Sequence, residues 1–343
     1  MRAFSYASPT KKEDVAGLLG KSWGEVEILA GGTDLLALMK DDITTPHRLV
    51  NIKGIQDFHG VTPGKDVVRI GALTTLAEIA ADNGLRKSHP VLAMAAGEAA
   101  SPQIRNLATI GGNLCQRPRC WYFRSGFGLL GQKDGKSLVT AGDNRYHAIL
   151  GNDGPAYFVS PSTVAPVLIA YKAQVQLFDG RGFREVPAEQ FFVVPKTEQE
   201  REHNLRPNEI VSAVMVPAAR GVRAGHYEVR QKEAFDWPYA TAAVALHMNG
   251  STVQSARVVM GHVAPVPWIS TEAAQALVGK AVTPATADQA AEAAVSKAKS
   301  LGRNEQKIHL ARVAVKRAIL AAAGSTEHAG LSNNSNGSHG GAA

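Results

Sequence analysis

Short β-branched runs alternate with short amphipathic stretches over the first hundred residues of the chain. The β-branched and apolar runs predict strands over 25–30, 48–52 and 67–70. Apolar residues at helical spacing predict helices over 10–19, 33–40, 76–81 and 91–100. The chain therefore begins as a unit of mixed α and β structure with short connections.

Residues 115–155 interrupt this pattern, because they are rich in glycine and show little periodicity. We interpret them as a long excursion with loop character, and loops of this length inside a domain are usually functional or mobile. Regular patterns then return and predict a helix over 164–171 and strands over 173–178 and 209–216.

A second unit begins near Gly221. Apolar runs predict strands over 226–229, 240–248 and 253–261, with Asn249-Gly250 as the turn of a hairpin. Helical patterns over 286–299 and 305–323 follow them. Residues 325–343 consist mainly of Gly, Ser and Asn, and we expect this tail to be disordered.

Composition agrees with a globular chain of about two domains. Of the 343 residues, 45% are hydrophobic and 20% are charged, which suits a sizeable core. No run approaches the roughly 20 apolar residues of a membrane span, and the first residues contain no apolar signal segment. We therefore expect a cytoplasmic protein, although a signal-bearing partner could carry it to the periplasm. Two cysteines exclude a disulfide scaffold and an all-cysteine metal site built from this chain alone.

The net charge of +7 is mostly scattered, but Arg117, Arg119 and Arg124 interleave with aromatic residues 121–123. Such a cluster could bind nucleic acid through charge and stacking. No recognisable nucleic-acid module surrounds it, and a protein interface or an anionic ligand is at least as plausible. We favour a subunit interface, where Arg and aromatic residues are enriched.

Several motifs suggest chemistry that their surroundings exclude. The G-x-S-x-G spacing at 20–24 lies between a predicted helix and a strand, the reverse of the order that a nucleophile elbow needs. Two Gly-Lys-Ser triplets lack the earlier glycine of a phosphate-binding P-loop. The eleven histidines form no metal-binding pattern. We predict no catalytic residue and no metal ligand on this chain.

Two similar segments give the clearest indication of a ligand: residues 30–35 (AGGTDL) and residues 109–114 (TIGGNL). Each is a Gly-Gly with a neighbouring threonine, an acid or amide, and apolar flanks, and the first joins a predicted strand to a helix. Glycines at such a turn let backbone N–H groups approach phosphate oxygens, and a helix N-terminus favours an anion. Together the two bends predict a dinucleotide whose pyrophosphate lies between them. The stretch 101–106 (SPQIRN), just upstream, adds amide and guanidinium donors.

These segments resemble the FAD-binding subunits of the molybdenum hydroxylases, the family of xanthine dehydrogenase, carbon monoxide dehydrogenase and bacterial aldehyde oxidoreductases. The resemblance covers roughly residues 1–324 and rests on segments in one order: 28–36 (ILAGGTDLL), 70–74 (IGALT), 103–106 (QIRN), 109–114 (TIGGNL), 160–162 (SPS) and 232–238 (KEAFDWP). The stretches 119–124 and 144–148 resemble the aldehyde oxidoreductases that have separate subunits.

The resemblance implies an α+β fold in three parts. Residues 1–220 would form a two-lobed FAD-binding domain of the vanillyl-alcohol-oxidase (PCMH) type, with lobes at about 1–55 and 56–220. Residues 224–324 would form a small C-terminal sheet-and-helix domain like that of carbon monoxide dehydrogenase flavoproteins.

The resemblance also implies a set of FAD contacts. Residues 30–35 and 109–113 would hold the pyrophosphate from two sides, Ile104 and Leu114 would pack near the ring or ribityl chain, and Lys232 would lie near the isoalloxazine, where a cation stabilises reduced flavin. The full set is Ile28, Leu29, Ala30, Gly31, Gly32, Thr33, Asp34, Leu35, Leu36, Ala72, Ser101, Ile104, Asn106, Thr109, Gly111, Gly112, Asn113, Leu114, Ser162, Thr163, Ile210 and Lys232.

Two departures from the family pattern change the expectation. Some relatives hold a [4Fe–4S] cluster with four cysteines in the excursion, where this chain keeps only Cys115 and Cys120, so we expect no cluster. The family often has an aspartate after Ser-Pro-Ser, where this chain has Thr163, which would make a weaker contact to an FAD hydroxyl.

The function that the resemblance implies is electron transfer. A partner subunit with [2Fe–2S] clusters, fed by a subunit with the molybdenum cofactor, would pass electrons through FAD to oxygen, a quinone or NAD. The alternative is a self-sufficient flavin oxidase of a small alcohol, although the sequence offers no persuasive base. A third alternative is a binding module that uses the basic patch at 117–124.

Overall fold

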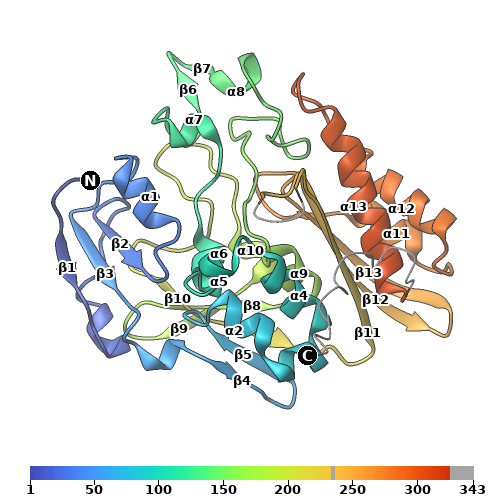
Figure 1. Cartoon of the computed structure of the whole chain (residues 1–343), viewed down its shortest axis with the longest axis horizontal. Helices are drawn as coiled ribbons and strands as arrows, with labels where there is room; N and C mark the ends of the chain where they lie inside the picture. The colour runs from blue at the N-terminus through green and yellow to red at the C-terminus, as the bar shows by residue number, and fades with distance from the viewer. Residues whose placement is uncertain (233–235, 325–343) are drawn as a thin grey trace, which may run out of the picture.

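The chain folds into three larger sheets and one small hairpin (Figure 1). The computed structural model describes residues 1–232 and 236–324. The first sheet is parallel in the order β1-β3-β2, with β1 at Ser5–Ala7, β3 at Arg48–Asn51 and β2 at Val26–Leu29. Helix α1 (Leu35–Lys40) follows β2 after the first glycine pair. The predicted strand–glycine–helix order at this point is confirmed.

The predicted helix over 10–19 is wrong. The structure has only a 3-10 turn there, η1 (Lys12–Val15), and Val15 is its one buried residue. A second 3-10 turn, η2 (Gln56–Phe58), leads into the next lobe. One buried position in a short segment provides too little packing to stabilise a longer helix.

The second sheet is antiparallel and collects strands from distant parts of the chain. Its order is β4 (Val61–Thr62), β5 (Val67–Gly71), β10 (Ile210–Pro217), β8 (Gln174–Phe178) and β9 (Phe183–Pro187). The helices of this lobe are α2 (Leu76–Ala81), α3 (Asn83–Ser88), α4 (Pro90–Glu98), α5 (Pro102–Arg105), α6 (Ile110–Cys115), α9 (Ala165–Ala170) and α10 (Ala188–Phe191). The largest core cluster joins this sheet to α2, α4 and α9. The prediction of two lobes in this region matches the two separate sheets.

The excursion over 115–155 is mostly irregular, as predicted. It contains α7 (Trp121–Arg124), the hairpin β6 (Gln132–Lys133) and β7 (Lys136–Ser137), and α8 (Leu138–Ala141), at the top of Figure 1. Phe123, Leu129 and Leu130 give it a small core of its own. Its end is held by Lys307 of the C-terminal domain, whose Nζ donates to the carbonyls of Tyr146 at 2.7 Å and His147 at 3.0 Å.

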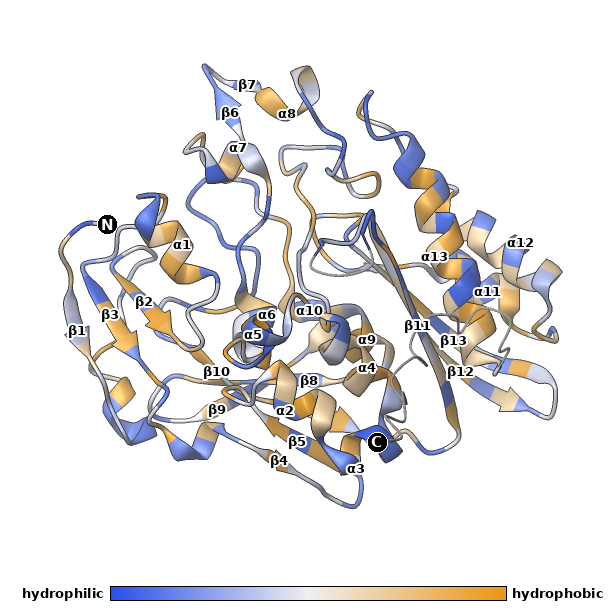
Figure 2. Cartoon of the chain, in the orientation of Figure 1, coloured by the Kyte–Doolittle hydropathy of each residue, from blue (hydrophilic) through white to orange (hydrophobic). Residues whose placement is uncertain are grey.

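The C-terminal domain is an antiparallel sheet with helices on one face. The strands are β11 (Val222–Val229), β12 (Ala240–Asn249), β13 (Thr252–Gly261) and β14 (Trp268–Ile269), and the helices are α11 (Thr271–Leu277), α12 (Pro284–Val295) and α13 (Gln306–Ala322). Figure 2 shows hydrophobic residues along these strands and α13. The hairpin at Asn249-Gly250 is confirmed, whereas α11 was not predicted from the sequence.

Close packing in this domain depends on small residues. A Cβ added at Gly225 of β11 would lie 2.2 Å from the carbonyl oxygen of Ala318 in α13. The opposite face of the sheet packs on the second lobe, because Ala243, Ala245 and Val259 belong to the core cluster of that lobe. The tail at 325–343, where we expected disorder, lies outside the described residues.

Candidate functional site

A cleft of about 520 Å³ lies where the first lobe, the second lobe and the C-terminal domain meet. Its wall includes Gly31 and Gly32 of the first lobe, Thr109 of the second lobe, and Arg230 and Trp237 of the C-terminal domain. The volume is within the range of roughly 300–1,000 Å³ that is typical of small-molecule and cofactor sites. Segments far apart in the sequence therefore converge on one cavity large enough for an organic cofactor.

The first glycine bend presents backbone donors at this cleft. The N–H groups of residues 31–34 donate no hydrogen bond to another described residue. Gly32 has a φ of +76°, which only glycine adopts readily, and this turn leads the chain from β2 into α1. Gly31 approaches the neighbouring lobe so closely that an added Cβ would lie 2.0 Å from the carbonyl oxygen of Leu107. The bend thus has free N–H groups of the kind that an anion requires.

The second glycine pair lies beside the first and lines the same cleft, but it has a different role. Gly111 and Gly112 are inside α6, and their N–H groups already bond the carbonyl of Ala72 and the hydroxyl of Thr109. A Cβ at Gly111 would lie 2.9 Å from the Cβ of Ala72, so this glycine allows close packing. The prediction that both pairs offer donors from opposite sides is therefore wrong for the second pair, because its N–H groups donate to the Ala72 carbonyl and to the hydroxyl of the N-cap residue Thr109.

Asp34 connects the bend to the excursion. Its carboxylate accepts from the backbone N–H of Arg117 at 2.8 Å and from Nη2 of Arg124 at 2.8 Å, and it lies 2.9 Å from Nη1 of Arg119. Arg117 also pairs with the buried Glu202 at 2.9 Å. Asp34 therefore positions arginines at the cleft, and a direct contact between its carboxylate and a pyrophosphate is electrostatically unfavourable.

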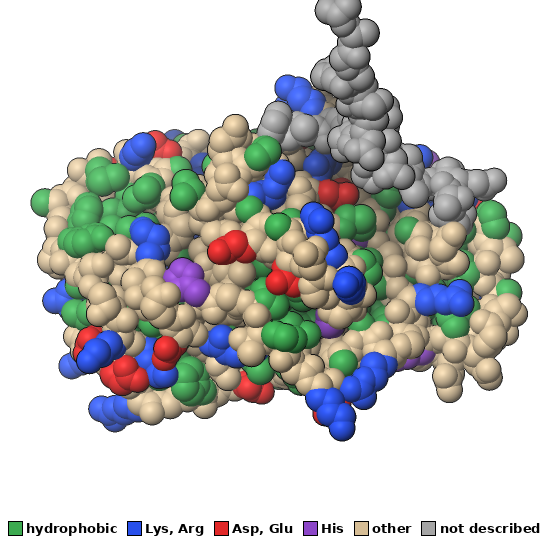
Figure 3. All heavy atoms as spheres, turned by 60° about the horizontal axis from the view of Figure 1, so that its bottom comes forward, with side chains coloured by type: hydrophobic (Ala, Val, Ile, Leu, Met, Phe, Trp, Pro, Cys, Tyr) green, Lys and Arg blue, Asp and Glu red, His purple; other side chains and the backbone are tan. Residues whose placement is uncertain are grey.

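The same contacts show that the arginine patch is bound largely within the chain, and its role as a subunit interface stays a prediction. The side chains of Arg117, Arg119 and Arg124 are only 14%, 29% and 19% exposed, and all three are bound within the chain. The guanidinium of Arg119 also stacks on Trp237, with its Cζ 4.6 Å from the ring centroid. On the face shown in Figure 3, basic and acidic side chains are mixed.

Most of the residues predicted to contact the cofactor lie in the wall of the cleft. These are Ile28, Ala30, Gly31, Gly32, Thr33, Asp34, Leu35, Ala72, Ser101, Ile104, Thr109, Gly111, Gly112, Asn113, Thr163 and Ile210. The structure thus brings together residues from five parts of the sequence at one cleft.

The other six predicted residues lie outside the wall: Leu29, Leu36, Asn106, Leu114, Ser162 and Lys232. Leu29 and Leu114 are buried in hydrophobic clusters, so Leu114 packs in the core where we expected it near a ring. Leu36 and Asn106 are exposed. Ser162 acts indirectly, because its hydroxyl donates to Oδ1 of Asn113 at 2.7 Å.

Lys232 is exposed and lies outside the cleft wall. Arg230, which directly follows β11, is the cationic residue that lines the wall at this point. Its guanidinium binds Glu228 and donates to the backbone carbonyl of Glu98 at 2.8 Å. The role that the resemblance implied for Lys232 is therefore not supported by its position.

One end of the cleft was missed from the sequence. Trp23, Glu27, Arg201 and His203 line it, and Arg201 pairs with Glu27 at 2.9 Å while its guanidinium lies over the Trp23 ring. Burial lowers the pKa of His203 to about 4, so this ring is neutral. No motif identifies these residues, because Glu27 and Arg201 are 174 positions apart in the sequence and only folding brings them together.

The two cysteines lie in different surroundings. Cys115 lines the cleft, and burial raises the pKa of its thiol to about 12. Cys120 is buried in the core of the excursion, with its Sγ 3.1 Å from Nε2 of His147. Burial also raises the pKa of Cys120, so both groups are protonated thiols at neutral pH.

Two lobes that enclose a long cleft, with a glycine bend bearing free N–H groups, define a nucleotide-cofactor-binding protein with a separate C-terminal domain. The comparisons with known proteins agree. The family described as "FAD binding domain in molybdopterin dehydrogenase" matches residues 2–219, and the "CO dehydrogenase flavoprotein C-terminal domain" matches residues 225–322. The chain belongs to this family, the FAD-binding medium subunits of the molybdenum hydroxylases.

Curated relatives belong to several multi-subunit oxidoreductases. The chain is 29% identical over 323 residues to the carbon monoxide dehydrogenase medium chain of Hydrogenophaga pseudoflava, covering 93% of this chain and 96% of the relative. It is 32% identical over 276 residues to the aldehyde oxidoreductase FAD-binding subunit PaoB of Escherichia coli (strain K12), covering 78% and 84%. These relatives confirm the family that the sequence motifs indicated.

Solved structures show the same fold. A carbon monoxide dehydrogenase from Hydrogenophaga pseudoflava that lacks the Mo-pyranopterin moiety superposes with a TM-score of 0.74 at 29% identity, over 94% of this chain and 98% of that chain. A Cu,Mo-CO dehydrogenase in its cyanide-inactivated form has a TM-score of 0.73 at 26% identity, over 94% and 98%. The expected two-lobed flavin-binding fold with its C-terminal domain is thereby confirmed. Among the described residues, no helix is both long and apolar enough to cross a bilayer.

Proposed function

We propose that this chain binds FAD in the cleft and relays electrons within a molybdenum-containing hydroxylase of the aldehyde oxidoreductase type. Electrons would arrive from a partner subunit with [2Fe–2S] clusters. That subunit would receive them from a subunit with the molybdenum cofactor. An acceptor such as oxygen, a quinone or NAD would remove them. FAD supplies the redox chemistry, and the chain binds, orients and tunes it.

The free N–H groups of the first glycine bend carry this proposal, because they face a cleft built from both lobes. The pyrophosphate would lie at residues 31–34, next to the hydroxyl of Thr33. The charges suit a diphosphate, since Asp34 is paired with both Arg119 and Arg124 and this group has a net charge of +1. The fit therefore rests on backbone donors that no other described residue uses and on the one positive charge left over in this group.

The two ends of the cleft suit the two ring systems of the cofactor. We assign the adenine to the end with Trp23, where an aromatic side chain and Leu19 provide an apolar surface. We assign the isoalloxazine to the end with Ile104 and Trp237, where the C-terminal domain contributes Arg230 to the wall. A cation at this end stabilises negative charge on the reduced ring.

The test is the flavin content and reducibility of the purified chain. We expect one FAD per chain, no reduction by small alcohols when the chain is alone, and reduction by an aldehyde when the molybdenum and iron–sulfur subunits are present. A purified chain that binds no FAD contradicts the proposal, and reduction by an alcohol in the absence of partners would favour the self-sufficient oxidase. An added iron–sulfur absorption band would contradict the absence of a cluster on this chain.

A further inference from the structure

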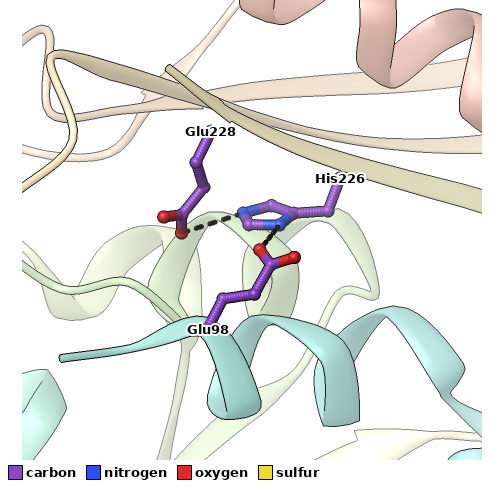
Figure 4. Close-up of side chains that lie close together, drawn as sticks. All are labelled: Glu98, His226 and Glu228. Carbon is purple, nitrogen blue, oxygen red and sulfur yellow. Dashed lines mark ion pairs between the residues drawn. The ribbon is translucent and has the colours of Figure 1, made fainter. Parts of the chain in front are cut away.

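An imidazole ring lies between two carboxylates at the end of the cleft formed by the C-terminal domain (Figure 4). Glu98 ends α4, while His226 and Glu228 lie two residues apart on β11 and so project from the same face of the sheet. Nδ1 of His226 is 3.5 Å from Oε2 of Glu98, and Nε2 is 3.6 Å from Oε1 of Glu228. The three side chains therefore form a continuous row with a titratable atom at every junction.

The atoms that face one another in the inner part of this row are buried and have no hydrogen-bond partner in the described part of the chain. The side chains of His226 and Glu228 are 0% and 3% exposed, whereas that of Glu98 is 40% exposed. Neither nitrogen of His226 nor Oε1 of Glu228 has a hydrogen-bond partner among the described residues. Buried polar atoms without partners are costly, so an arrangement that occurs in a native protein needs a reason. Both glutamates lie in the wall of the cleft, which places the row next to the bound ligand.

The charge balance calls for one proton. Glu98 and Glu228 bring two negative charges, and Arg230, bound to Glu228, supplies one positive charge. Among the described residues, two further charged groups lie nearby: Arg105, whose guanidinium donates to the carbonyls of residues 99 and 100, and Asp236 in the wall. Glu98, Glu228 and Arg230 together have a net charge of −1. One proton held by the row brings this net charge to zero.

The two ends of the row differ in their affinity for that proton. Burial raises the pKa of the Glu228 carboxyl. At Glu98 burial acts in the same direction, but His226 and Arg230 outweigh it, and the pKa of that carboxyl is lowered. His262, which lies near His226, stays neutral because burial lowers its pKa to about 3. These directions favour a proton at the inner end of the row, next to the ligand.

A single metal ion fits this geometry poorly, although the three side chains are of ligating types. A metal binds an imidazole through one nitrogen, while here each carboxylate faces a different nitrogen of the same ring. The guanidinium of Arg230 also occupies Glu228 and would repel a cation. The arrangement suits the transfer of a proton, in which both ring nitrogens take part.

We propose that Glu98, His226 and Glu228 form a proton relay between the rim of the cleft and the bound flavin, an inference that rests on the proposed function. When two electrons arrive from the iron–sulfur partner, the O–H bond of Glu228 breaks and its proton passes to the reduced cofactor. Glu228 then takes the proton of His226 Nε2, water protonates the ionised Glu98, and Glu98 passes this proton to Nδ1. A shift of about 0.5 Å at each junction brings the donor and acceptor within hydrogen-bond distance. Oxidation of the flavin returns the proton along the same row.

The experiment follows proton release from the chain loaded with FAD. The photoreduced protein is mixed with ferricyanide, which accepts electrons without protons, and a pH indicator and the flavin absorbance are recorded together. The variants are H226Q and E228Q. The control is H247Q, because His247 is an exposed histidine on β12 of the same sheet. FAD content and melting temperature are measured first for every variant.

We expect proton release to keep pace with flavin oxidation in the natural protein and in H247Q. In H226Q and E228Q it should lag by about 10²-fold, the usual contribution of a positioned acid–base group. Normal FAD content with unchanged proton release in both variants overturns the relay and leaves the proposed function intact. Absence of FAD from the natural protein refutes both proposals. A stoichiometric divalent metal that H226Q lacks would replace the relay with a metal site.

Discussion

The contact between the first glycine bend and the second lobe provides the sharpest test of the cleft. Replacing Gly31 with alanine places a Cβ 2.0 Å from the carbonyl oxygen and 2.7 Å from the carbonyl carbon of Leu107. Both atoms belong to the backbone, so no side-chain rotation can relieve the overlap. The segment at Leu107 must move away from the bend, and the wall of the cleft must open.

The size of the effect follows from this displacement. Inserting a methyl group into a packed site costs roughly 1–3 kcal/mol. If separating the two walls relieves that strain, a ligand that contacts both walls must bring them together again. Binding of the ligand then restores the strain. Since about 1.4 kcal/mol corresponds to a tenfold change, we expect the Kd for FAD to rise by about 5-fold to 150-fold in G31A.

The assay is a titration of the FAD-free chain with FAD, followed by quenching of flavin fluorescence, with a melting curve of each variant. The matched control is G17A, in the same lobe, where an added Cβ has no atom within 4 Å. We expect G17A to bind FAD like the natural protein. Equal FAD affinity in G31A and G17A, with unchanged melting temperatures, would refute the close contact and the role of the bend.

Three further predictions address other parts of the molecule. D34N should reduce FAD content and lower the melting temperature, because the neutral amide weakens the partly buried charged contacts to Arg119 and Arg124, at a cost of about 1.5–3 kcal/mol; an unchanged FAD content would contradict this. In the unfolded chain His203 has its ordinary pKa of about 6.5, whereas in the folded chain burial lowers this pKa to about 4. The free energy of unfolding therefore has its full value above pH 6.5 and falls by up to about 3 kcal/mol as the pH drops to 4. The melting temperature should depend less on pH in H203Q. G225A should lower the melting temperature, since its Cβ would lie 2.2 Å from the Ala318 carbonyl oxygen, whereas G182A, with no neighbouring atom within 4 Å, should not.

Local features of the sequence predicted the elements that depend on neighbouring residues. The strand, glycine bend and helix at 26–40 were predicted because alternating apolar residues, a glycine at positive φ and a helix start all act within one short segment. The hairpin at Asn249-Gly250 was predicted for the same reason. The helix expected over 10–19 failed because its stability depends on packing that the segment does not find.

The chemistry of the cleft depends on residues that are distant in sequence. The sequence by itself determined the family and the position of the two glycine pairs, since short motifs carry both. That the N–H groups of the first pair stay free while those of the second are used is a property of the folded chain. Only the tertiary structure decided that Asp34 binds arginines 83 and 90 positions away and that Arg230 of β11 reaches Glu98 of α4. Those pairings are set by how sheets and helices pack, and a local pattern of apolar and polar residues contains no record of them.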